Sequence, residues 1–387
     1  MKTLGWLFSI AAIGSLSMPL VAQKTIPLAK GMRDLKEVAL SSVARSIDYI
    51  PLETTPESLL GQDILDVTPA GNYLFVCDYN YVFQFTPEGK FIRKIGKKGQ
   101  GPGEFSDILS IAYNEPKKEI YLSDFKAGQV HVYSFEGNYL RDVKTEQGSL
   151  TPYVDPSGNL YTVSNAYLRS KEKTGKELFV YAPDGKLSHD FSFHFKEGET
   201  YPRLIFSFAI VYPFKGGIFY KNPLETVIYR IEGGKKTPVY DLDLSQYEKL
   251  KGEDDAILAT HKDVGTNLPN KEAEKKIHFI SILETDHNLG IHYAQEEVRC
   301  FAWLDKQSGK LCRLHAPNAD RDGFIDDLEG GYPVFPQYQK ADKVISVLPA
   351  AILQEKVKPA TAKGSLKSVL RNLQEDDNQV LQIVTLK

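Results

Sequence analysis

The 387-residue sequence is poor in cysteine and methionine and has no strongly basic stretch. Its formal net charge is −3, and without a cluster of lysine and arginine it lacks the electrostatic basis for binding nucleic acid. Beyond the N-terminus there is no apolar run long enough to span a membrane. No Gly-x-Ser-x-Gly sequence occurs, so the serine nucleophile of the α/β-hydrolases is absent. Tyrosine and phenylalanine, by contrast, number 21 and 20, and this aromatic content favours β-strands.

The single long apolar stretch is at the N-terminus. Lys2 precedes an apolar run from Leu4 to Leu16, and small residues lead to a plausible cleavage point after Ala22. A run this short that ends in small residues is typical of a secretory signal peptide. We therefore expect residues 1–22 to be removed, residues 23–45 to lead into the folded domain, and the mature protein to be periplasmic or secreted. A lipid anchor is not expected, because no cysteine stands at the cleavage point.

The three cysteines are Cys77, Cys300 and Cys312, so at least one is unpaired. Cys77 lies inside an apolar run and is expected to behave as a small buried hydrophobe. Cys300 and Cys312 flank a predicted hairpin turn. A disulfide between them is open at this point, because the strand register decides whether the two side chains meet.

The most informative feature is an internal repeat. Gly89, Gly137, Gly185 and Gly233 each lie in a turn between two strand-like segments, and each follows the previous one by 48 residues. A fifth copy follows a longer gap, with its turn at Gly309. Glycine suits such hairpin turns because it adopts a positive φ. Two further strand candidates precede most of these hairpins, and four short strands per unit are the signature of a propeller blade.

Counting these units predicts an all-β, six-bladed β-propeller over residues 46–387. The first five blades are expected at 62–96, 104–144, 149–192, 204–244 and 276–316. The remaining segments supply two strands within 322–348 and one at 379–387, which leaves the sixth blade a strand short. Residues 46–53 can provide that strand, and pairing them with 379–387 would close the ring without an exposed edge.

Two stretches depart from the repeat. Residues 245–275 are charged and helix-prone, and residues 349–376 have apolar residues at helical spacing. We predict a helical insertion in each. These insertions can be solvent-exposed additions to one face of the propeller. Alternatively, they can form a lid or a surface that binds a partner.

Blade 2 contains a Gly-rich stretch at 96–103, a strand ending at Asp124 and then a hairpin, and this order resembles the NHL repeat. The segments 49–56 and 378–387 resemble those of exported six-bladed propeller proteins common in Bacteroidetes, many of which are lipoproteins of unassigned function. The resemblance implies a fold and a compartment. It supplies no catalytic residues.

One segment has the spacing of a calcium-binding loop. Asn318, Asp320, Asp322, Asp326 and Glu329 place oxygen donors around Gly323, which allows a sharp turn. Calcium is the only cofactor that the sequence suggests. The alternative interpretation is that the acidic residues begin the inner strand of the last blade.

Five carboxylates are candidates for the axial channel because they stand at or near predicted innermost strands: Asp63, Asp107, Asp326, Asp327 and Glu329. Asp78 and Asp124 follow second strands and are expected to stabilise turns. The function favoured by these patterns is a non-catalytic binding or scaffold module of the cell envelope, monomeric, that binds a glycan, a peptide or a protein on one face. The alternative is a calcium-dependent hydrolase or lyase with its site at the axis.

Overall fold

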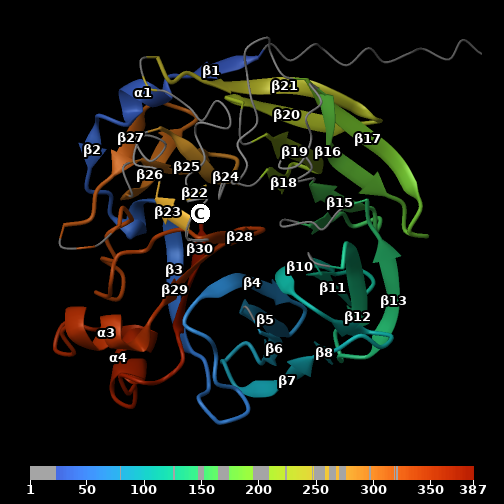
Figure 1. Ribbon diagram of the computed structural model, residues 1–387. Coiled ribbons are helices and arrows are strands. Elements are labelled where there is room, and N and C mark those ends of the chain that lie inside the picture. The colour runs from blue at the N-terminus through green and yellow to red at the C-terminus, as the bar shows by residue number, and fades with distance from the viewer. Residues whose placement is uncertain are drawn as a thin grey trace, which may run out of the picture.

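The computed structural model describes residues 23–78, 80–124, 127–146, 152–163, 174–194, 209–222, 225–245, 247, 258–260, 267–269, 276–295, 298–317, 319 and 321–387. The predicted signal peptide lies outside the described residues. Six sheets are arranged as a ring around a central axis, and the four blade strands of each are antiparallel (Figure 1). The protein is therefore a six-bladed β-propeller, as the repeat predicts. Within the described residues, no helix is both long and apolar enough to cross a membrane.

Blades 1 to 3 each contain four consecutive strands, ordered from the axis outward. Blade 1 is formed by β4 (Ile64–Ala70), β5 (Tyr73–Asp78), β6 (Val82–Phe85) and β7 (Phe91–Ile95). Blade 2 is formed by β10 (Ile108–Asn114), β11 (Glu119–Asp124), β12 (Gln129–Ser134) and β13 (Tyr139–Lys144). Blade 3 is formed by β14 (Tyr153–Val154), β15 (Leu160–Val163), β16 (Thr174–Tyr181) and β17 (Leu187–His194). The short strands β8 (Lys97–Lys98) and β9 (Glu104–Phe105) pair with each other between blades 1 and 2.

Blades 4 and 5 follow the same plan. Blade 4 is formed by β18 (Ile210–Phe214), β19 (Gly217–Lys221), β20 (Val227–Glu232) and β21 (Lys235–Leu242). Blade 5 is formed by β24 (His278–Glu284), β25 (Asn288–Gln295), β26 (Val298–Asp305) and β27 (Leu311–Leu314). The turn glycines of blades 1 to 5 have φ values of 85°, 86°, 81°, 55° and 71°, which confirms the conformation that the repeat predicts.

Blade 6 joins the two ends of the domain. Its strands are β28 (Tyr338–Lys340), β29 (Lys343–Leu348), β30 (Val380–Leu386) and, outermost, β3 (Ala44–Pro51). Strands β3 and β30 are antiparallel, with Ile47 opposite Val384. The predicted closure of the ring is confirmed.

The segment before β3 packs along the outside of the ring, which the sequence patterns did not reveal. Strand β1 (Lys24–Ile26) pairs in parallel with β21, and β2 (Leu35–Lys36) pairs in parallel with β27. The short helix α1 (Leu28–Gly31) lies between them, and the 3₁₀ turn Leu40–Ser42 follows (Figure 1). We call residues 23–43 the N-terminal belt. It covers the outer edges of blades 4 and 5.

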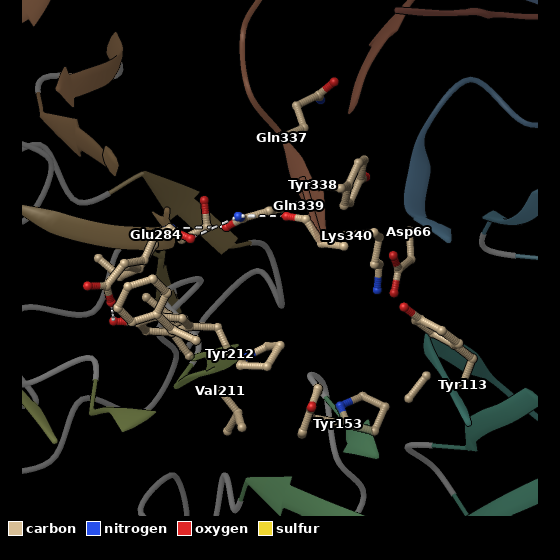
Figure 2. A pocket seen from close by; sticks show the side chains of 18 of the residues that line it. Asp66, Tyr113, Tyr153, Val211, Tyr212, Glu284, Gln337, Tyr338, Gln339 and Lys340 are labelled. Carbon is tan, nitrogen blue, oxygen red and sulfur yellow. Dashed lines mark hydrogen bonds between the residues drawn. The ribbon is translucent and has the colours of Figure 1, made fainter. Parts of the chain in front are cut away.

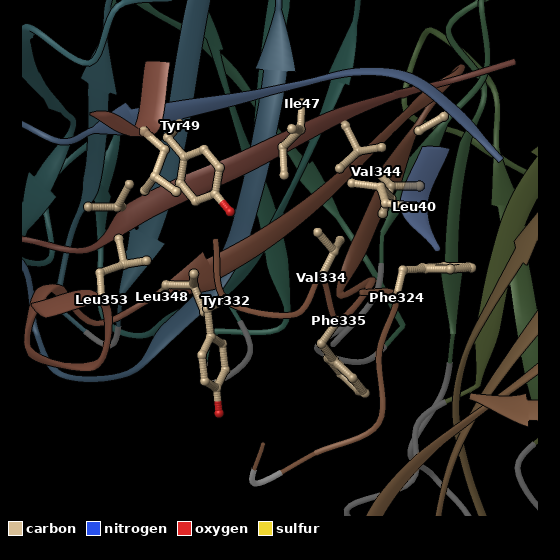
Figure 3. Packing of buried hydrophobic residues seen from close by; sticks show 14 of the residues in the cluster. Leu40, Ile47, Tyr49, Phe324, Tyr332, Val334, Phe335, Val344, Leu348 and Leu353 are labelled. Carbon is tan, nitrogen blue, oxygen red and sulfur yellow. The ribbon is translucent and has the colours of Figure 1, made fainter. Parts of the chain in front are cut away.

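The hydrophobic core is divided among the blade interfaces. Six clusters of buried side chains are found among the described residues, one between each pair of neighbouring blades. Figure 3 shows the cluster between blades 5 and 6, where Tyr49 of β3 lies among residues of the last blade. Each fully buried side chain of this kind contributes about 1.5–3 kcal/mol. A blade alone would leave these faces in water, so the ring is the stable unit.

The structure describes the insertion at 349–376 throughout and the one at 245–275 only in part. Residues 349–376 contain α3 (Ala350–Lys356) and α4 (Gly364–Leu370), whose Leu353 and Leu366 are buried in the cluster between blades 5 and 6. Helices were correctly predicted there. Within 245–275 the described residues include two short paired strands, β22 (Leu258–Thr260) and β23 (Asn267–Pro269). The charged stretches for which a helix is predicted lie almost entirely outside the described residues, so the helical insertion there stays a prediction.

All three cysteines are free thiols. Cys312 lies opposite Trp303 in the β26–β27 pair, three residues along the strand from Cys300. An odd separation puts Cys300 on the other face of β26, because successive side chains of a strand alternate. The register therefore rules out a disulfide between Cys300 and Cys312.

A tyrosine-lined axial cavity as candidate functional site

The innermost strands of the six blades surround a cavity of about 1390 Å³. Its walls are formed by β4, β10, β14, β18, β24 and β28 together with the turns that follow most of them. Every blade contributes to it because each inner strand faces the axis. Ligands of proteins preferentially occupy such concave, mostly apolar sites with a few polar groups in fixed positions.

Aromatic side chains from three different blades reach this cavity. Tyr113 of β10, Tyr153 of β14 and Tyr338 of β28 all line it and are half-buried (Figure 2). Burial raises the pKa of each of these hydroxyls. The hydroxyl groups therefore stay protonated near neutral pH and can donate hydrogen bonds as well as accept them. The Tyr338 hydroxyl donates to the carbonyl of Ile64 in blade 1.

A carboxylate and an ammonium group lie on the same side of the cavity as Tyr113. Asp66 of β4 is buried, and its Oδ2 accepts hydrogen bonds from the Ser110 hydroxyl at 3.0 Å and the Ile111 backbone N–H at 3.2 Å. The Lys340 ammonium lies 5.5 Å from the centre of the Tyr113 ring, in cation–π range. These residues come from blades 1, 6 and 2, so the ring brings together groups that are far apart in the sequence (Figure 2).

Glu284, at the end of β24 in blade 5, forms hydrogen bonds with residues of blades 4 and 6 at the opposite wall. Its carboxylate accepts hydrogen bonds from the hydroxyls of Tyr212 at 2.8 Å and Tyr240 at 2.7 Å, both in blade 4. The Lys306 ammonium, 2.6 Å away, completes the cluster. The Gln339 side chain of blade 6 bonds to the backbone N–H and C=O of Glu284 (Figure 2). Because its carboxylate is fully enclosed by these partners, Glu284 fixes the wall and is not free to act on a ligand.

The carboxylates that the sequence assigned to the channel are elsewhere. Asp63 is exposed, Asp107 is half-buried, and neither lines the cavity. Asp326 accepts hydrogen bonds from the Tyr49 hydroxyl and from the backbone N–H groups of residues 328, 329 and 331. Since Tyr49 is on β3, the outermost strand, Asp326 stabilises a turn at the outer part of blade 6. Asp326 therefore does not line the axial cavity, contrary to the prediction.

The remaining two acids have structural partners as well. Asp327 accepts hydrogen bonds from the backbone and hydroxyl of Ser41, which anchors the N-terminal belt to blade 6. Glu329 accepts hydrogen bonds from the Ser365 backbone N–H and hydroxyl and from the Leu366 N–H at the start of α4. Their positions in the loop before β28 looked axial in the sequence because this loop precedes an inner strand. In the structure the loop runs along the outer part of the blade.

The calcium hypothesis does not fit the described donors. Asp322 forms an ion pair with Arg313 at 2.6 Å and accepts from the Phe301 backbone N–H, whereas Asp326 and Glu329 bind the separate partners given above. Asn318 and Asp320 lie outside the described residues. In the part of the chain that the structure describes, no group of three or more His, Cys, Asp or Glu side chains is arranged to hold a metal ion.

Sequence reasoning did identify the turn-stabilising acids. Asp78 accepts from the backbone N–H groups of Asn80, Tyr81 and Gly61, and Asp124 plays the equivalent role for Ser106 and Ala127. The sequence patterns did not single out Asp66 as a residue of the cavity wall, although this residue interrupts the apolar run of the predicted inner strand. That interruption was the available signal, because a buried acid in an inner strand requires partners across a blade interface.

Fold and cavity together define a six-bladed propeller with an axial cavity. The chain belongs to the DUF4934 family, a domain of unknown function, whose pattern matches residues 23–385. No curated protein matches it. It is similar to the crystal structure of a "Putative exported protein" from Bacteroides fragilis NCTC 9343, at 19% identity and a TM-score of 0.69, over 94% of this chain and 99% of that one. A DUF4221 family member from Bacteroides vulgatus has 9% identity and a TM-score of 0.48, over 89% of this chain and 97% of that one.

The likeness to the Bacteroides fragilis structure supports the propeller fold, and the description of that protein as exported agrees with the kind of relative that the sequence resemblance implied. The NHL-like character of the repeats stays a prediction.

Proposed function

We propose that this protein is an exported, non-catalytic binding module that holds a glycan in its axial cavity. The observation that carries the proposal is the wall of that cavity, where Tyr113, Tyr153 and Tyr338 from three blades surround a mostly apolar space with a few polar side chains. Tyrosine offers a flat apolar ring and a hydrogen-bonding hydroxyl. A sugar ring presents the matching combination of an apolar C–H face and hydroxyl groups at its edge.

The polar groups of the cavity also suit a sugar better than an apolar peptide side chain. Asp66, Gln337 and Lys340 provide an acceptor and donors at separate points of the wall. Hydroxyl groups both donate and accept, so one polyhydroxylated ligand can satisfy all of them. A volume of about 1390 Å³ exceeds the usual 300–1,000 Å³ of small-molecule sites, which leaves room for several sugar rings. The resemblance to an exported protein is in keeping with a ligand met outside the cytoplasm.

The proposal is tested with an array of neutral and acidic oligosaccharides, followed by isothermal titration calorimetry on those that bind. Tyr113→Ala and Tyr153→Ala should each weaken binding about tenfold, equivalent to about 1.4 kcal/mol. Tyr139→Ala is the matched control, since Tyr139 is 39% exposed on the outer strand β13, and it should bind normally. If oligosaccharides fail to bind, or bind equally well to all three variants, the axial glycan site is refuted.

A further inference from the structure

One stretch of the cavity wall contains a buried imidazole with an unused nitrogen. His292 of β25 lines the cavity, is 3% exposed, and has its Nδ1 atom 3.3 Å from the hydroxyl oxygen of Ser281 on β24. Its Nε2 atom has no hydrogen-bond partner. An unsatisfied buried polar atom costs about 1–3 kcal/mol. Such a group is uncommon in a folded protein, and at a cavity wall a ligand atom can satisfy it.

A cation lines the same part of the cavity. Arg299 of β26 is exposed, and among the described residues no carboxylate forms an ion pair with its guanidinium. Burial together with the charges of Arg299 and Arg321 lowers the pKa of His292 to about 3. The imidazole is therefore neutral at physiological pH. If the Ser281 hydroxyl donates to Nδ1, the proton of the neutral ring is on Nε2, which makes that nitrogen a donor.

Blade 6 adds another donor near this pair, because the His292 ring packs against Phe335, two residues before Gln337, with 4.7 Å between the ring centres. The Gln337 side-chain oxygen accepts the backbone N–H of Val347. That bond orients the amide and leaves its NH₂ group without a partner among the described residues. Gln337 also lines the cavity, next to Tyr338 in the sequence (Figure 2). Arg299, His292 and Gln337 thus all line the cavity, and each has a nitrogen without a hydrogen-bond partner among the described residues.

We infer that Arg299, His292 and Gln337 form a subsite for the carboxylate of an acidic sugar within the glycan bound by the axial cavity. This inference rests on the proposed function and narrows its ligand to glycans that contain a uronic acid. A guanidinium pairs with a carboxylate through two parallel hydrogen bonds, and Arg299, which has no ion-pair partner in the described part of the chain, can balance one negative charge. The neutral imidazole and the amide supply directional hydrogen bonds without adding charge. A sugar that carries no anion should bind this subsite more weakly, because it leaves the Arg299 guanidinium without a charged partner.

The first test compares a galacturonate oligosaccharide with its methyl ester, which keeps the sugar rings and removes the charge. Calorimetry on the whole protein should show that the acidic probe binds at least about tenfold more tightly, a difference of about 1.4 kcal/mol. Arg299→Gln should abolish this preference while leaving affinity for the methyl ester unchanged. Arg45→Gln is the matched control, because Arg45 is an exposed arginine on the outermost strand β3, and it should keep the preference.

The second test separates a ligand-binding role of His292 from a structural one. His292→Leu removes the unsatisfied nitrogen and keeps a similar volume, so the unfolding free energy should stay the same or rise, while affinity for the acidic probe falls. A structural histidine would give the opposite pattern, with loss of stability and unchanged affinity.

The outcomes distinguish this inference from the function on which it rests. Equal binding of the acidic probe and the methyl ester, weakened by Tyr113→Ala, would overturn the carboxylate subsite and leave the glycan site standing. Tighter binding of a phosphorylated sugar, or of a peptide with a free C-terminus, than of the acidic probe would also overturn the assignment to a uronic acid. Failure of every oligosaccharide to bind would overturn both proposals.

Discussion

At the scale of single residues, the sequence identified acids whose hydrogen-bond partners are close along the chain. It did not identify those whose partners lie in another blade. Asp78 and Asp124 bind backbone groups in nearby turns and were identified correctly. Asp66 accepts a hydrogen bond from Ser110 across a blade interface, and Glu284 accepts one from Tyr212 of the neighbouring blade. Such contacts depend on which blades are neighbours and on the register within each blade. A local pattern therefore reveals a turn acid more readily than an axial site.

Asp322 illustrates the same difference and gives a prediction about calcium. Its carboxylate is almost fully buried against Arg313, whose side chain is about a quarter exposed. Asp322→Ala should therefore destabilise the protein by about 2–3 kcal/mol, somewhat below the cost of breaking a fully buried pair. The loss should be the same with calcium and with a chelator in thermal melts. A calcium-dependent rise in melting temperature that Asp322→Ala removes would instead restore the calcium loop. Asp322→Asn, which keeps an acceptor for the Phe301 N–H, should be the milder change.

At the scale of elements, the 48-residue step predicted five hairpins because a turn glycine and two flanking strands are local features. Strands whose partners are remote in sequence were harder to recognise. In β1 and β2 only two or three residues pair, too few for a periodic pattern to appear. The insertion at 245–275 also contains such short strands, Leu258–Thr260 and Asn267–Pro269, which pair with each other; its helix-prone stretches lie almost entirely outside the described residues. Local composition decides such short elements less than the neighbours that they meet.

The hairpin turns provide a matched pair of substitutions. Gly89 and Gly309 both have positive φ values, of 85° and 71°. A Cβ atom at Gly89 would overlap the carbonyl oxygen of Pro51, whereas nothing lies within 4 Å of one at Gly309. Gly309→Ala should therefore cost about 1 kcal/mol for the backbone conformation alone. Gly89→Ala should cost about 3 kcal/mol because the turn must also move away from β3. Urea unfolding of both variants measures this; equal losses would show that the turn of blade 1 does not pack against the closing strand.

At the scale of the whole molecule, closure of the ring was predictable because two unpaired strand candidates at opposite ends of a repeat have only each other as partners. The existence of an axial cavity follows from that closure. Its lining does not, because side chains from all six blades meet there and each depends on the register of its own sheet. The N-terminal belt likewise requires the finished ring, since β1 and β2 add to the outer edges of blades that form much later in the chain.

The closure itself can be locked covalently. Ser46 of β3 is exposed and lies opposite Thr385 of β30, so Ser46→Cys with Thr385→Cys, in a Cys312→Ser background, should form a disulfide under mild oxidation. Linking the two ends of the domain restricts the unfolded chain and should contribute about 3–5 kcal/mol, which corresponds to a rise of at least about 5 °C in melting temperature. Asp48→Cys with Thr385→Cys is the mismatched control, because Asp48 lies opposite Ile383. Mass spectrometry detects the bond. Efficient cross-linking of the mismatched pair in preference to the matched one would show that β3 joins blade 6 in another register, and the packing of Tyr49 against Asp326 would then have to change with it.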